Sequence, residues 1–259
     1  MLSIVTGASR GIGLEYARVL ARDYGSDLIL VARSEDSLNQ AARDITAQYG
    51  VKAEVVAMDL SERDAAERLH GWTVSRGMEP DVLVNNAGTF FFNEFVGTSM
   101  ERIEGLLCLH VITLTKLCRL YGQDFCARGS GFILNMSSLS TWMVCPGIQT
   151  YNASKAYIYN FTKSLRFELR PKGVEVLTVT PGMVDTTLYG LNADLRKLAV
   201  RLGINTPPER LAKKALRRLF KGRKTCMPGA VNHIAKPFLK HLPDWVIRFT
   251  MKRIAKYQK

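Results

Sequence analysis

The sequence lacks the usual features of exported and membrane-spanning proteins. Its first residues have neither the charged region nor the apolar core of a secretory signal, and the chain has no run of about 18 or more apolar residues. It also lacks a Gly/Ser-rich or Pro-rich linker, a low-complexity tract and an evident repeat. We therefore expect a cytoplasmic protein built around one main domain.

Cysteine is scarce and irregularly spaced. The five cysteines are odd in number, and no two of them stand in C-x-x-C spacing. This pattern argues against a disulfide framework and against a zinc site. We expect no bound metal and reduced, mostly buried side chains at Cys108, Cys118, Cys126, Cys145 and Cys226.

Positive charge is concentrated at one end of the chain. Residues 196 to 259 carry 18 Lys or Arg against two acids, a net charge of +16. The other 195 residues carry 18 Lys or Arg against 21 acids, a net charge of −3. A slightly acidic body therefore ends in a basic extension. No nucleic-acid-binding motif accompanies this charge, so we expect no nucleic-acid partner.

Short, nearly continuous apolar runs alternate with segments of helical period. Examples of the helical segments are residues 13–25, 37–50 and 99–127. The apolar runs are typical of strands buried on both faces of a parallel sheet. We therefore predict an α/β fold, a Rossmann-type doubly wound parallel sheet with helices on both faces. The expected strands are residues 2–5, 27–32, 52–58, 81–86, 131–136 and 174–179.

A glycine-rich loop follows the first expected strand and leads into a helix. In TGASRGIG, the first glycine permits a tight turn and the second allows the backbone to approach a pyrophosphate. The N-terminus of the helix supplies free N–H groups and a positive dipole end. A strand-to-helix turn that binds nothing is the alternative, but the position of the loop favours a dinucleotide site.

Five motifs in order resemble the short-chain dehydrogenase/reductase family, and in particular its NADP-preferring ketoreductases. They are TGASRGIG, the NNAG tetrapeptide Asn85 to Gly88, Ser138, the YNASK stretch and PGMVDT from Pro181 to Thr186. The resemblance implies a dinucleotide-binding catalytic domain over residues 1–228. It leaves residues 229–259 as a basic amphipathic helical extension.

The resemblance identifies Tyr151 and Lys155, with Ser138, as the catalytic set. Residues four apart on a helix share one face, although such a pair is also found as a packed tyrosine beside a snorkelling lysine. Reduction of a carbonyl requires a proton donor, and an ordinary tyrosine pKa of about 10 is too high for neutral pH. A nearby ammonium lowers that pKa, so Lys155 can tune Tyr151. In the family the lysine also binds the nicotinamide ribose, and the serine binds the substrate oxygen.

The cofactor expected from the sequence is NADPH. The second strand ends in Ala32-Arg33-Ser34 and has no carboxylate for a ribose hydroxyl, whereas Arg33 and Arg10 can meet a 2′-phosphate. Arg33 as a solvated charge and Asp59 as the N-cap of the next helix are the alternatives. The resemblance implies these cofactor-binding residues: Gly7, Ser9, Arg10, Gly11, Ile12, Gly13, Arg33, Asp59, Leu60, Asn86, Ala87, Gly88, Tyr151, Lys155, Pro181, Gly182, Val184 and Thr186.

His110 departs from the family pattern. It stands where the family usually has an Asn that helps to hold a water relay from the lysine to solvent. His110 could keep such a relay through its two ring nitrogens and is therefore a further catalytic candidate. A core histidine with a backbone partner is the alternative.

The segments near the chemistry are rich in apolar side chains. They favour a hydrophobic ketone, such as a 3-oxoacyl thioester, a steroid-like ketone or an aromatic ketone, over a sugar. A non-catalytic NADPH-binding sensor or scaffold is the competing class, and the complete Ser138, Tyr151 and Lys155 set argues against it. The apolar residues are Phe90, Phe91, Phe92, Phe95, Trp142, Met143, Val144, Leu188, Tyr189 and Leu191.

The basic extension is expected to be helical. Thr206 to Glu209 has the form of a capping box with proline in the first turn of a helix. Residues 243–259 place apolar and cationic side chains on opposite arcs, with Trp245 and Phe249 among the cations. Such a helix suits an anionic membrane surface, or else docks on the body or on another subunit. We also expect a homo-oligomer, either a dimer or a tetramer.

Overall fold

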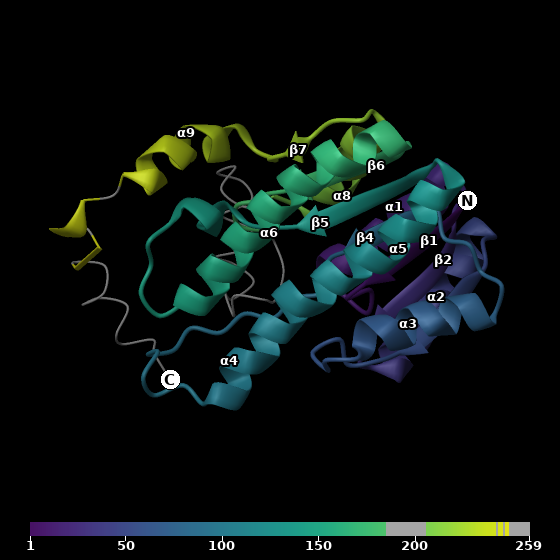
Figure 1. The fold of residues 1–259 in the computed structure, drawn as a ribbon, viewed down its shortest axis with the longest axis horizontal. Helices are drawn as coiled ribbons and strands as arrows, with labels where there is room; N and C mark the ends of the chain where they lie inside the picture. The colour runs from purple at the N-terminus through teal and green to yellow at the C-terminus, as the bar shows by residue number, and fades with distance from the viewer. Residues whose placement is uncertain (185–205, 242, 246, 249–259) are drawn as a thin grey trace.

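The structure is a computed structural model, and it describes residues 1–184, 206–241, 243–245, 247 and 248. A seven-stranded parallel sheet runs through the body in the order β3-β2-β1-β4-β5-β6-β7 (Figure 1). Its strands are β1 (Leu2–Thr6), β2 (Asp27–Ala32), β3 (Ala53–Ala57), β4 (Val82–Asn85), β5 (Gly131–Met136), β6 (Val174–Val179) and β7 (Thr225–Cys226). The predicted doubly wound parallel sheet is confirmed.

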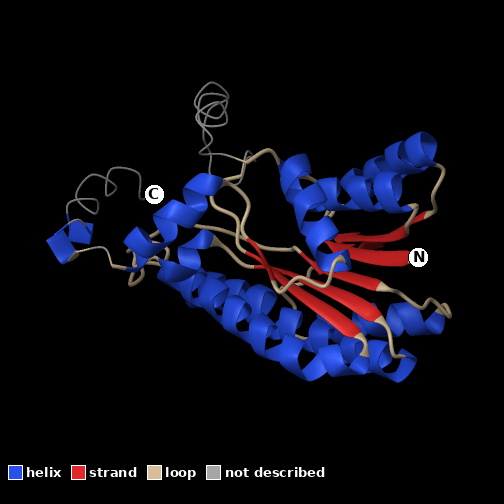
Figure 2. Cartoon of the chain, turned by 90° about the horizontal axis from the view of Figure 1, so that it is seen from above, coloured by secondary structure: helices blue, strands red, loops and turns tan. Residues whose placement is uncertain are grey.

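Helices cover both faces of the sheet, as Figure 2 shows. One apolar core lies under α1 (Gly11–Tyr24), α2 (Glu35–Tyr49) and α8 (Pro208–Phe220). The other lies under α3 (Ala65–Ser75), α5 (Leu114–Arg128) and α6 (Gln149–Leu169). The strands other than the edge strand β3 are mostly buried between these layers, which explains why they read as continuous apolar runs and not as alternating ones.

The six predicted strands are all present, and β7 is the one that the sequence did not indicate. It has two residues, Thr225 and Cys226, which pair with Thr178 and Val179 of β6. Two residues are too few to display a periodic pattern. This strand places the end of α8 beside the last long strand of the sheet.

The long helix expected over residues 99–127 is divided into three segments. It begins as α4 (Met100–Leu107), continues as a π-helical segment η1 (Cys108–Thr113) and ends as α5. Ser99 caps the first segment, since its Oγ accepts a hydrogen bond from the N–H of Arg102. A π-helical turn inside an α-helix is rare and occurs frequently at functional sites.

The helix after residue 206 does not begin with the predicted capping box. Thr206 is instead paired with Val184 in a parallel bridge, and its N–H donates to the carbonyl oxygen of Met183 at 3.0 Å. The helix α8 starts at Pro208, so the expected proline in the first turn is confirmed. The Glu209 side chain forms an ion pair with Arg22 of α1 at 2.8 Å.

The extension expected to be helical over residues 229–259 contains the helix α9 (Ala230–Lys240). Of the helix expected over residues 243–259, all but 243–245, 247 and 248 lie outside the described residues. Within the described part of the chain, no helix has the length and apolar character needed to cross a bilayer. The five cysteines are free thiols, three of them buried, as predicted.

Candidate active site

The expected site residues gather where the carboxyl ends of β1, β4, β5 and β6 meet. The strand order reverses between β1 and β4, because β2 lies on the far side of β1 and β5 on the far side of β4. The connections that follow β1 and β4 therefore lead toward helices on opposite faces of the sheet, α1 and α5. Ligands of open parallel sheets bind at such a switch point.

Tyr151 and Lys155 lie on the same buried face of α6, as their spacing predicts. The Nζ atom of Lys155 is 5.5 Å from the centroid of the Tyr151 ring. The Phe90 ring also contacts the Tyr151 ring edge-on, with centroids 5.1 Å apart. Both side chains of the pair are more than nine-tenths buried. The arrangement holds a phenol and an amine together, away from bulk water.

Burial changes the protonation of Lys155. Desolvation lowers the pKa of its amine from 10.5 to about 7. Its Nζ donates a hydrogen bond to the carbonyl oxygen of Met136 at 3.0 Å. The ammonium expected from the sequence is therefore only partly present at neutral pH. A nearby phosphate charge would favour the ammonium form.

Ser138 is held at the end of β5, where η2 (Leu139–Trp142), a short 3-10 helix, begins. Its Oγ accepts a hydrogen bond from the N–H of Ser140 at 3.1 Å, so the hydroxyl hydrogen is left to donate elsewhere. The preceding Ser137 donates to the carbonyl oxygen of Lys155 at 2.7 Å. This bond joins the end of β5 to α6 and places Ser138 beside the catalytic helix.

The glycine loop is packed tightly against the NNAG segment. Gly7 has a φ of +69°, and a Cβ there would lie 2.9 Å from the Cα of Ala87. A Cβ on Gly13 would lie 2.0 Å from the carbonyl oxygen of Gly7. Neither position can hold a side chain. The first turn of α1, residues 11–14, carries no acidic residue, so its positive end suits a pyrophosphate.

Thr6 joins the two loops, although the sequence did not single it out. Its Oγ1 donates to the carbonyl oxygen of Val84 at 3.1 Å and accepts from the N–H groups of Asn86 and Ala87 at 2.9 and 3.0 Å. The Asn86 amide returns a bond to the carbonyl oxygen of Thr6 at 3.0 Å. A hydroxyl directly before the glycine loop was the available signal. Among the other expected loop residues, Ser9 lies in the turn after β1, Arg10 precedes α1 without capping it, and Ile12 lies in the first turn of α1.

Arg33 and Asp59 stand next to each other at the ends of β2 and β3. The Arg33 side chain is 77% exposed, with its Nη1 3.9 Å from Asp59 Oδ2. Burial acts to raise the pKa of Asp59, but hydrogen bonds from Ser61 and the charge of Arg33 outweigh it, so the pKa lies below its ordinary value. The exposed guanidinium suits a phosphate better than a neutral hydroxyl.

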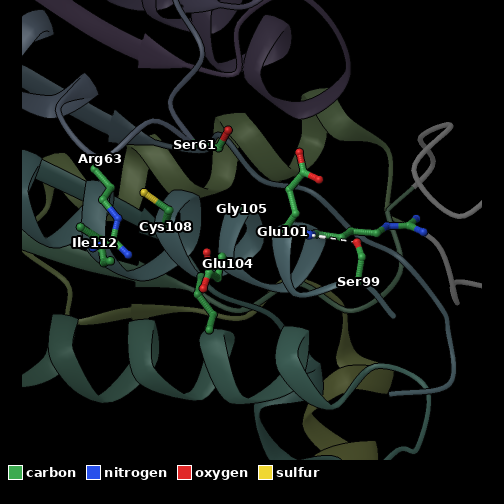
Figure 3. Close-up of a pocket in the computed structure, with 10 residues that line it drawn as sticks. Ser61, Arg63, Ser99, Glu101, Glu104, Gly105, Cys108 and Ile112 are labelled. Carbon is green, nitrogen blue, oxygen red and sulfur yellow. Dashed lines mark hydrogen bonds between the residues drawn. The ribbon is translucent and has the colours of Figure 1, made fainter. Parts of the chain in front are cut away.

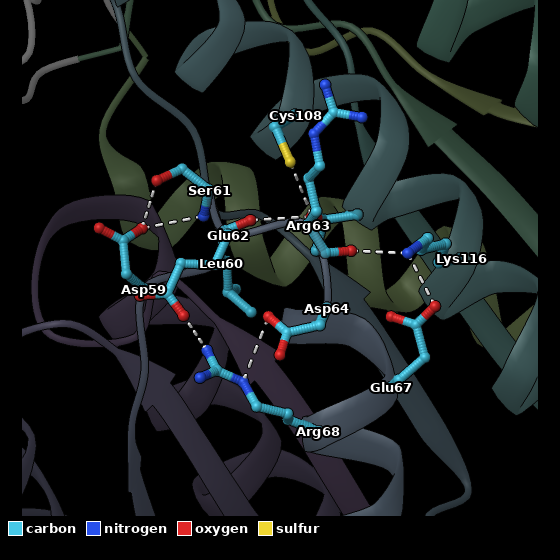
Figure 4. Close-up of polar contacts among 11 residues, drawn as sticks. Asp59, Leu60, Ser61, Glu62, Arg63, Asp64, Glu67, Arg68, Cys108 and Lys116 are labelled. Atoms are coloured by element: carbon cyan, nitrogen blue, oxygen red, sulfur yellow. Dashed lines mark hydrogen bonds and ion pairs between the residues drawn. The ribbon is translucent and has the colours of Figure 1, made fainter. Parts of the chain in front are cut away.

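Asp59 does not cap the next helix, so that alternative is wrong. Its Oδ1 accepts hydrogen bonds from the N–H and Oγ of Ser61 at 2.9 and 2.7 Å, which closes a local turn (Figure 4). The helix α3 starts six residues later, at Ala65, with Asp64 before it. Leu60, between them, is buried, and its carbonyl oxygen accepts from Thr113 Oγ1 at 2.8 Å.

The PG turn after β6 lies over the catalytic strand ends. The carbonyl oxygen of Pro181 accepts from the N–H of Leu139 at 2.8 Å, which ties the turn to η2. A Cβ on Gly182 would lie 2.3 Å from Oδ1 of Asn232, so α9 packs directly on the turn. Val184 is buried. Thr186 lies outside the described residues.

His110 is buried in η1, and both ring nitrogens contact protein groups. Its Nε2 accepts from the N–H of Thr89 at 3.0 Å, and its Nδ1 is 2.9 Å from Ser154 Oγ. Burial and then the charge of Lys155 lower the pKa of this imidazole well below its ordinary value. The bond from the Thr89 backbone N–H agrees with the alternative in which His110 is a core histidine with a backbone partner.

The apolar residues expected around the substrate divide into core and surface. Phe91 and Tyr151 belong to a small buried cluster, with Phe90 and Phe92 packed against it. Phe95 and Val144 are exposed. Trp142 lies under the Nζ of Lys236 of α9, 4.3 Å from the ring centroid. Leu188, Tyr189 and Leu191 lie outside the described residues.

A groove of about 740 Å³ borders these residues, since Arg102, which lines it, lies over the Phe91 ring at 4.6 Å from the centroid (Figure 3). It runs along α4 and the loop after β3, and both cationic and acidic side chains line it, among them Arg63, Arg102, Glu101 and Glu104. Because side chains of both signs line the groove, the lining favours neither a cationic nor an anionic ligand. Among the residues that the structure describes, no three His, Cys, Asp or Glu side chains are grouped to hold a metal ion.

Comparisons with known proteins agree with this geometry. The sequence model of the short chain dehydrogenase family matches residues 2–194. The chain is 35% identical over 191 residues to a very-long-chain 3-oxoacyl-CoA reductase of Anas platyrhynchos, covering 72% of this chain and 60% of the relative. The chain thus spans about 60% of the length of this reductase. Over 269 residues it is 30% identical to 17-beta-hydroxysteroid dehydrogenase type 3 of Mus musculus, covering 99% of this chain and 83% of the relative.

Solved structures show the same fold. A short-chain dehydrogenase from Sphingobium yanoikuyae in complex with NADPH superimposes with a TM-score of 0.78 at 27% identity, covering 100% of this chain and 96% of that one. A structure from a study of 7beta-hydroxysteroid dehydrogenase stereoselectivity gives a TM-score of 0.85 at 27% identity, covering 96% and 95%. With its glycine loop, its switch point between β1 and β4 and its paired Tyr151 and Lys155, the chain belongs to the short-chain dehydrogenase/reductase family of oxidoreductases.

Proposed function

We propose that this protein uses NADPH to reduce a ketone to a secondary alcohol on a hydrophobic, lipid-like substrate. The observation that carries the proposal is the buried pair of Tyr151 and Lys155 on one face of α6, beside Ser138 at the end of β5. A phenol and an amine held in this way suit proton transfer to a carbonyl oxygen. A non-catalytic sensor would have no need of them.

NADPH, when bound, supplies the hydride. The hydroxyl of Ser138, whose oxygen already accepts a bond from Ser140, donates its hydrogen to the substrate oxygen and orients the carbonyl. Tyr151 donates the proton as negative charge develops on that oxygen. Lys155, with a pKa of about 7, is poised to hold or release a proton at neutral pH next to the phenol.

The proposed cofactor site uses the chain's own glycine loop and cations. The pyrophosphate would lie at the N-terminus of α1, where Gly7, Gly11 and Gly13 keep side chains away. Arg33, at the end of β2, would meet the 2′-phosphate together with Arg10. Asn86, Ala87 and Gly88 would form the floor of the site. The NADPH-bound relative from Sphingobium yanoikuyae supports this assignment.

The substrate class is proposed from the surroundings and from the relatives. Phe90 and Phe92 offer apolar surface near Tyr151, and Trp142 lies against Tyr159 of the same helix. The relatives are named as reductases of 3-oxoacyl-CoA and as hydroxysteroid dehydrogenases, both of which act on groups attached to apolar skeletons. We propose a 3-oxoacyl thioester or a steroid-like or aromatic ketone.

The residues after 228 are proposed as an extension docked on the catalytic domain. Asn232 packs on Gly182, and Lys236 lies over Trp142, so α9 covers part of the site. On the outer side of α9, Val231, Ile234 and Phe238 are exposed within a segment that is basic in sequence. We propose that this face gives the enzyme peripheral contact with an anionic membrane. A homo-oligomer in the cytoplasm stays our expectation.

The direct test is a screen of NADPH oxidation. The protein is supplied with 3-oxoacyl thioesters, steroid ketones and small aromatic ketones, and the alcohol product is identified. We expect turnover with at least one class and its loss in Tyr151→Phe. A protein that binds NADPH but reduces no member of the three classes would support the sensor alternative.

A further inference from the structure

His110 connects two parts of the site that are distant in sequence. The N–H of Thr89 donates to Nε2, and a backbone N–H can only donate, so Nε2 is the unprotonated nitrogen. The proton is therefore on Nδ1, which donates to Ser154 Oγ at 2.9 Å. Ser154 Oγ in turn donates to the carbonyl oxygen of Tyr151 at 2.7 Å. One chain of hydrogen bonds thus runs from the loop after β4 to the first turns of α6.

The imidazole is packed closely between these two parts. A Cβ on Gly88 would lie 3.1 Å from His110 Nε2 and 3.7 Å from Lys155 Nζ. The His110 ring also contacts the Tyr151 ring edge-on, with centroids 5.8 Å apart. A small displacement of the imidazole would therefore reach the loop, the lysine and the phenol together.

The π-helical segment explains why His110 reaches this place. It presents His110 to Thr89 and, three residues later, presents Thr113 to the carbonyl oxygen of Leu60. Thr89 and Leu60 lie in two loops that both contain expected cofactor-binding residues, Gly88 in one and Asp59 in the other. One six-residue segment is hydrogen-bonded to both loops.

The charge around His110 keeps the ring neutral. Lys155 and Tyr151, both on α6, are ionisable side chains that face it. Protonation of Nε2 would direct an N–H at the Thr89 N–H and would place a second cation near Lys155. The ring is thus suited to fix geometry and unsuited to pass protons.

We propose that His110 is a positioning residue that works as a neutral Nδ1–H imidazole. Its Nε2 holds the cofactor loop through Thr89, and its Nδ1 holds the start of the catalytic helix through Ser154. This inference rests on the proposed function, because it assigns the two contacts to NADPH binding and to proton transfer.

Two substitutions separate the contacts. A Gln side chain at 110 can reach the place of Nε2 and keep the Thr89 bond, whereas Asn can reach only the place of Nδ1 and keep the Ser154 bond. We expect His110→Asn to weaken NADPH about tenfold with kcat within about twofold, since one lost hydrogen bond of about 1.4 kcal/mol is a factor of ten. We expect His110→Gln to keep NADPH affinity and to lower kcat about tenfold.

Ser154→Ala is the matched variant on the other side of the bond. It should reproduce the kcat loss of His110→Gln with NADPH affinity unchanged. NADPH affinity is measured by fluorescence titration without turnover, and the melting temperature of each variant is recorded. A wild-type protein that binds NADPH but reduces no ketone refutes the proposed function, while the affinity comparison still tests the Thr89 contact.

Two results would overturn the inference. If both His110 variants stay within about twofold of wild type in NADPH affinity and in kcat, the histidine positions nothing. If both lose affinity and kcat to the same degree, with equal falls in melting temperature, His110 only fills the core.

Discussion

The Nζ of Lys155 donates a hydrogen bond to the carbonyl oxygen of Met136, 3.0 Å away, at the end of β5. The amine is therefore tied to the sheet and enclosed, and burial lowers its pKa to about 7. In an unfolded chain the same amine has a pKa of 10.5. Because the pKa of Lys155 differs between the folded and the unfolded chain, the stability of the protein depends on pH.

Lys155→Met should stabilise the cofactor-free protein while abolishing turnover. Between pH 10.5 and about 7 the unfolded chain binds a proton that the folded protein does not, so the wild type loses stability as the pH falls through this window. The variant has no amine at this position and therefore keeps the free energy of unfolding that the wild type loses by pH 7, which is on the order of 3–5 kcal/mol. Urea unfolding at several pH values between 7 and 10 measures it.

Lys163→Met, on the same helix, is the control for Lys155→Met. Lys163 lies over the ring of Tyr159 and is not buried. Its substitution should leave the pH dependence of stability as in the wild type. If Lys155→Met and wild type show parallel stability curves, Lys155 is not strongly desolvated.

Tyr151→Phe should lower kcat by about 10²–10⁴-fold, the usual contribution of a positioned acid. NADPH affinity should remain close to wild type, because the change removes a hydroxyl and keeps the ring that packs on Phe90. Steady-state kinetics and fluorescence titration give the two quantities. Turnover within about tenfold of wild type would show that another group donates the proton.

Arg33→Ala should weaken NADPH by about 10–100-fold and leave NADH nearly unchanged. The reason is the loss of charge-assisted hydrogen bonds of about 1.5–3 kcal/mol to the 2′-phosphate. Arg43→Ala is the control, since it removes an exposed cation from the neighbouring helix α2. An equal loss for both cofactors would mean that Arg33 does not read the phosphate.

Ile234→Asn combined with Phe238→Asn should reduce co-sedimentation with anionic vesicles. These side chains are 66% and 69% exposed on α9, so the change removes apolar contact with lipid and leaves the core intact. Wild-type binding should fall as salt rises, because screening weakens the attraction of the basic extension.

Phe167→Asn is the matched control for the vesicle experiment. Phe167 is 80% exposed but lies on α6, away from the basic extension. It should bind vesicles like the wild type. If the wild type ignores anionic vesicles at low salt, or if the α9 variant changes the oligomeric state, the exposed face of α9 serves another contact.

The strands were predictable because burial on both faces leaves a strong local signal. Val82 to Asn85 and Val174 to Val179 are nearly uniform apolar runs. The π-helical segment was not predictable, because the apolar residues of Cys108–Thr113 satisfy an α-helical period equally well over so short a span. The position of Thr206 was not predictable either, because its pairing with Val184 is a tertiary contact that leaves no local signal.

The site was predictable where its residues form a motif. Gly7, Gly13, Tyr151 and Lys155 lie together as expected. The hydroxyl of Thr6 bonds to residues about 80 positions away, and no local pattern announces such a contact. The low pKa of Lys155 depends on burial by several elements together, so it could not be inferred from spacing.

The π-helical turn also constrains how this chain can change in length. A π turn holds one residue more than the α-helical turn it replaces, while both complete one full turn of the helix. Deletion of one residue within Cys108–Thr113 would therefore restore a regular helix and leave α4 and α5 on their present faces. A regular helix would set a different angle between His110 and Thr113, so their bonds to Thr89 and Leu60 would not both survive. Descendants of this gene can therefore exchange residues in the segment far more readily than they can lose one.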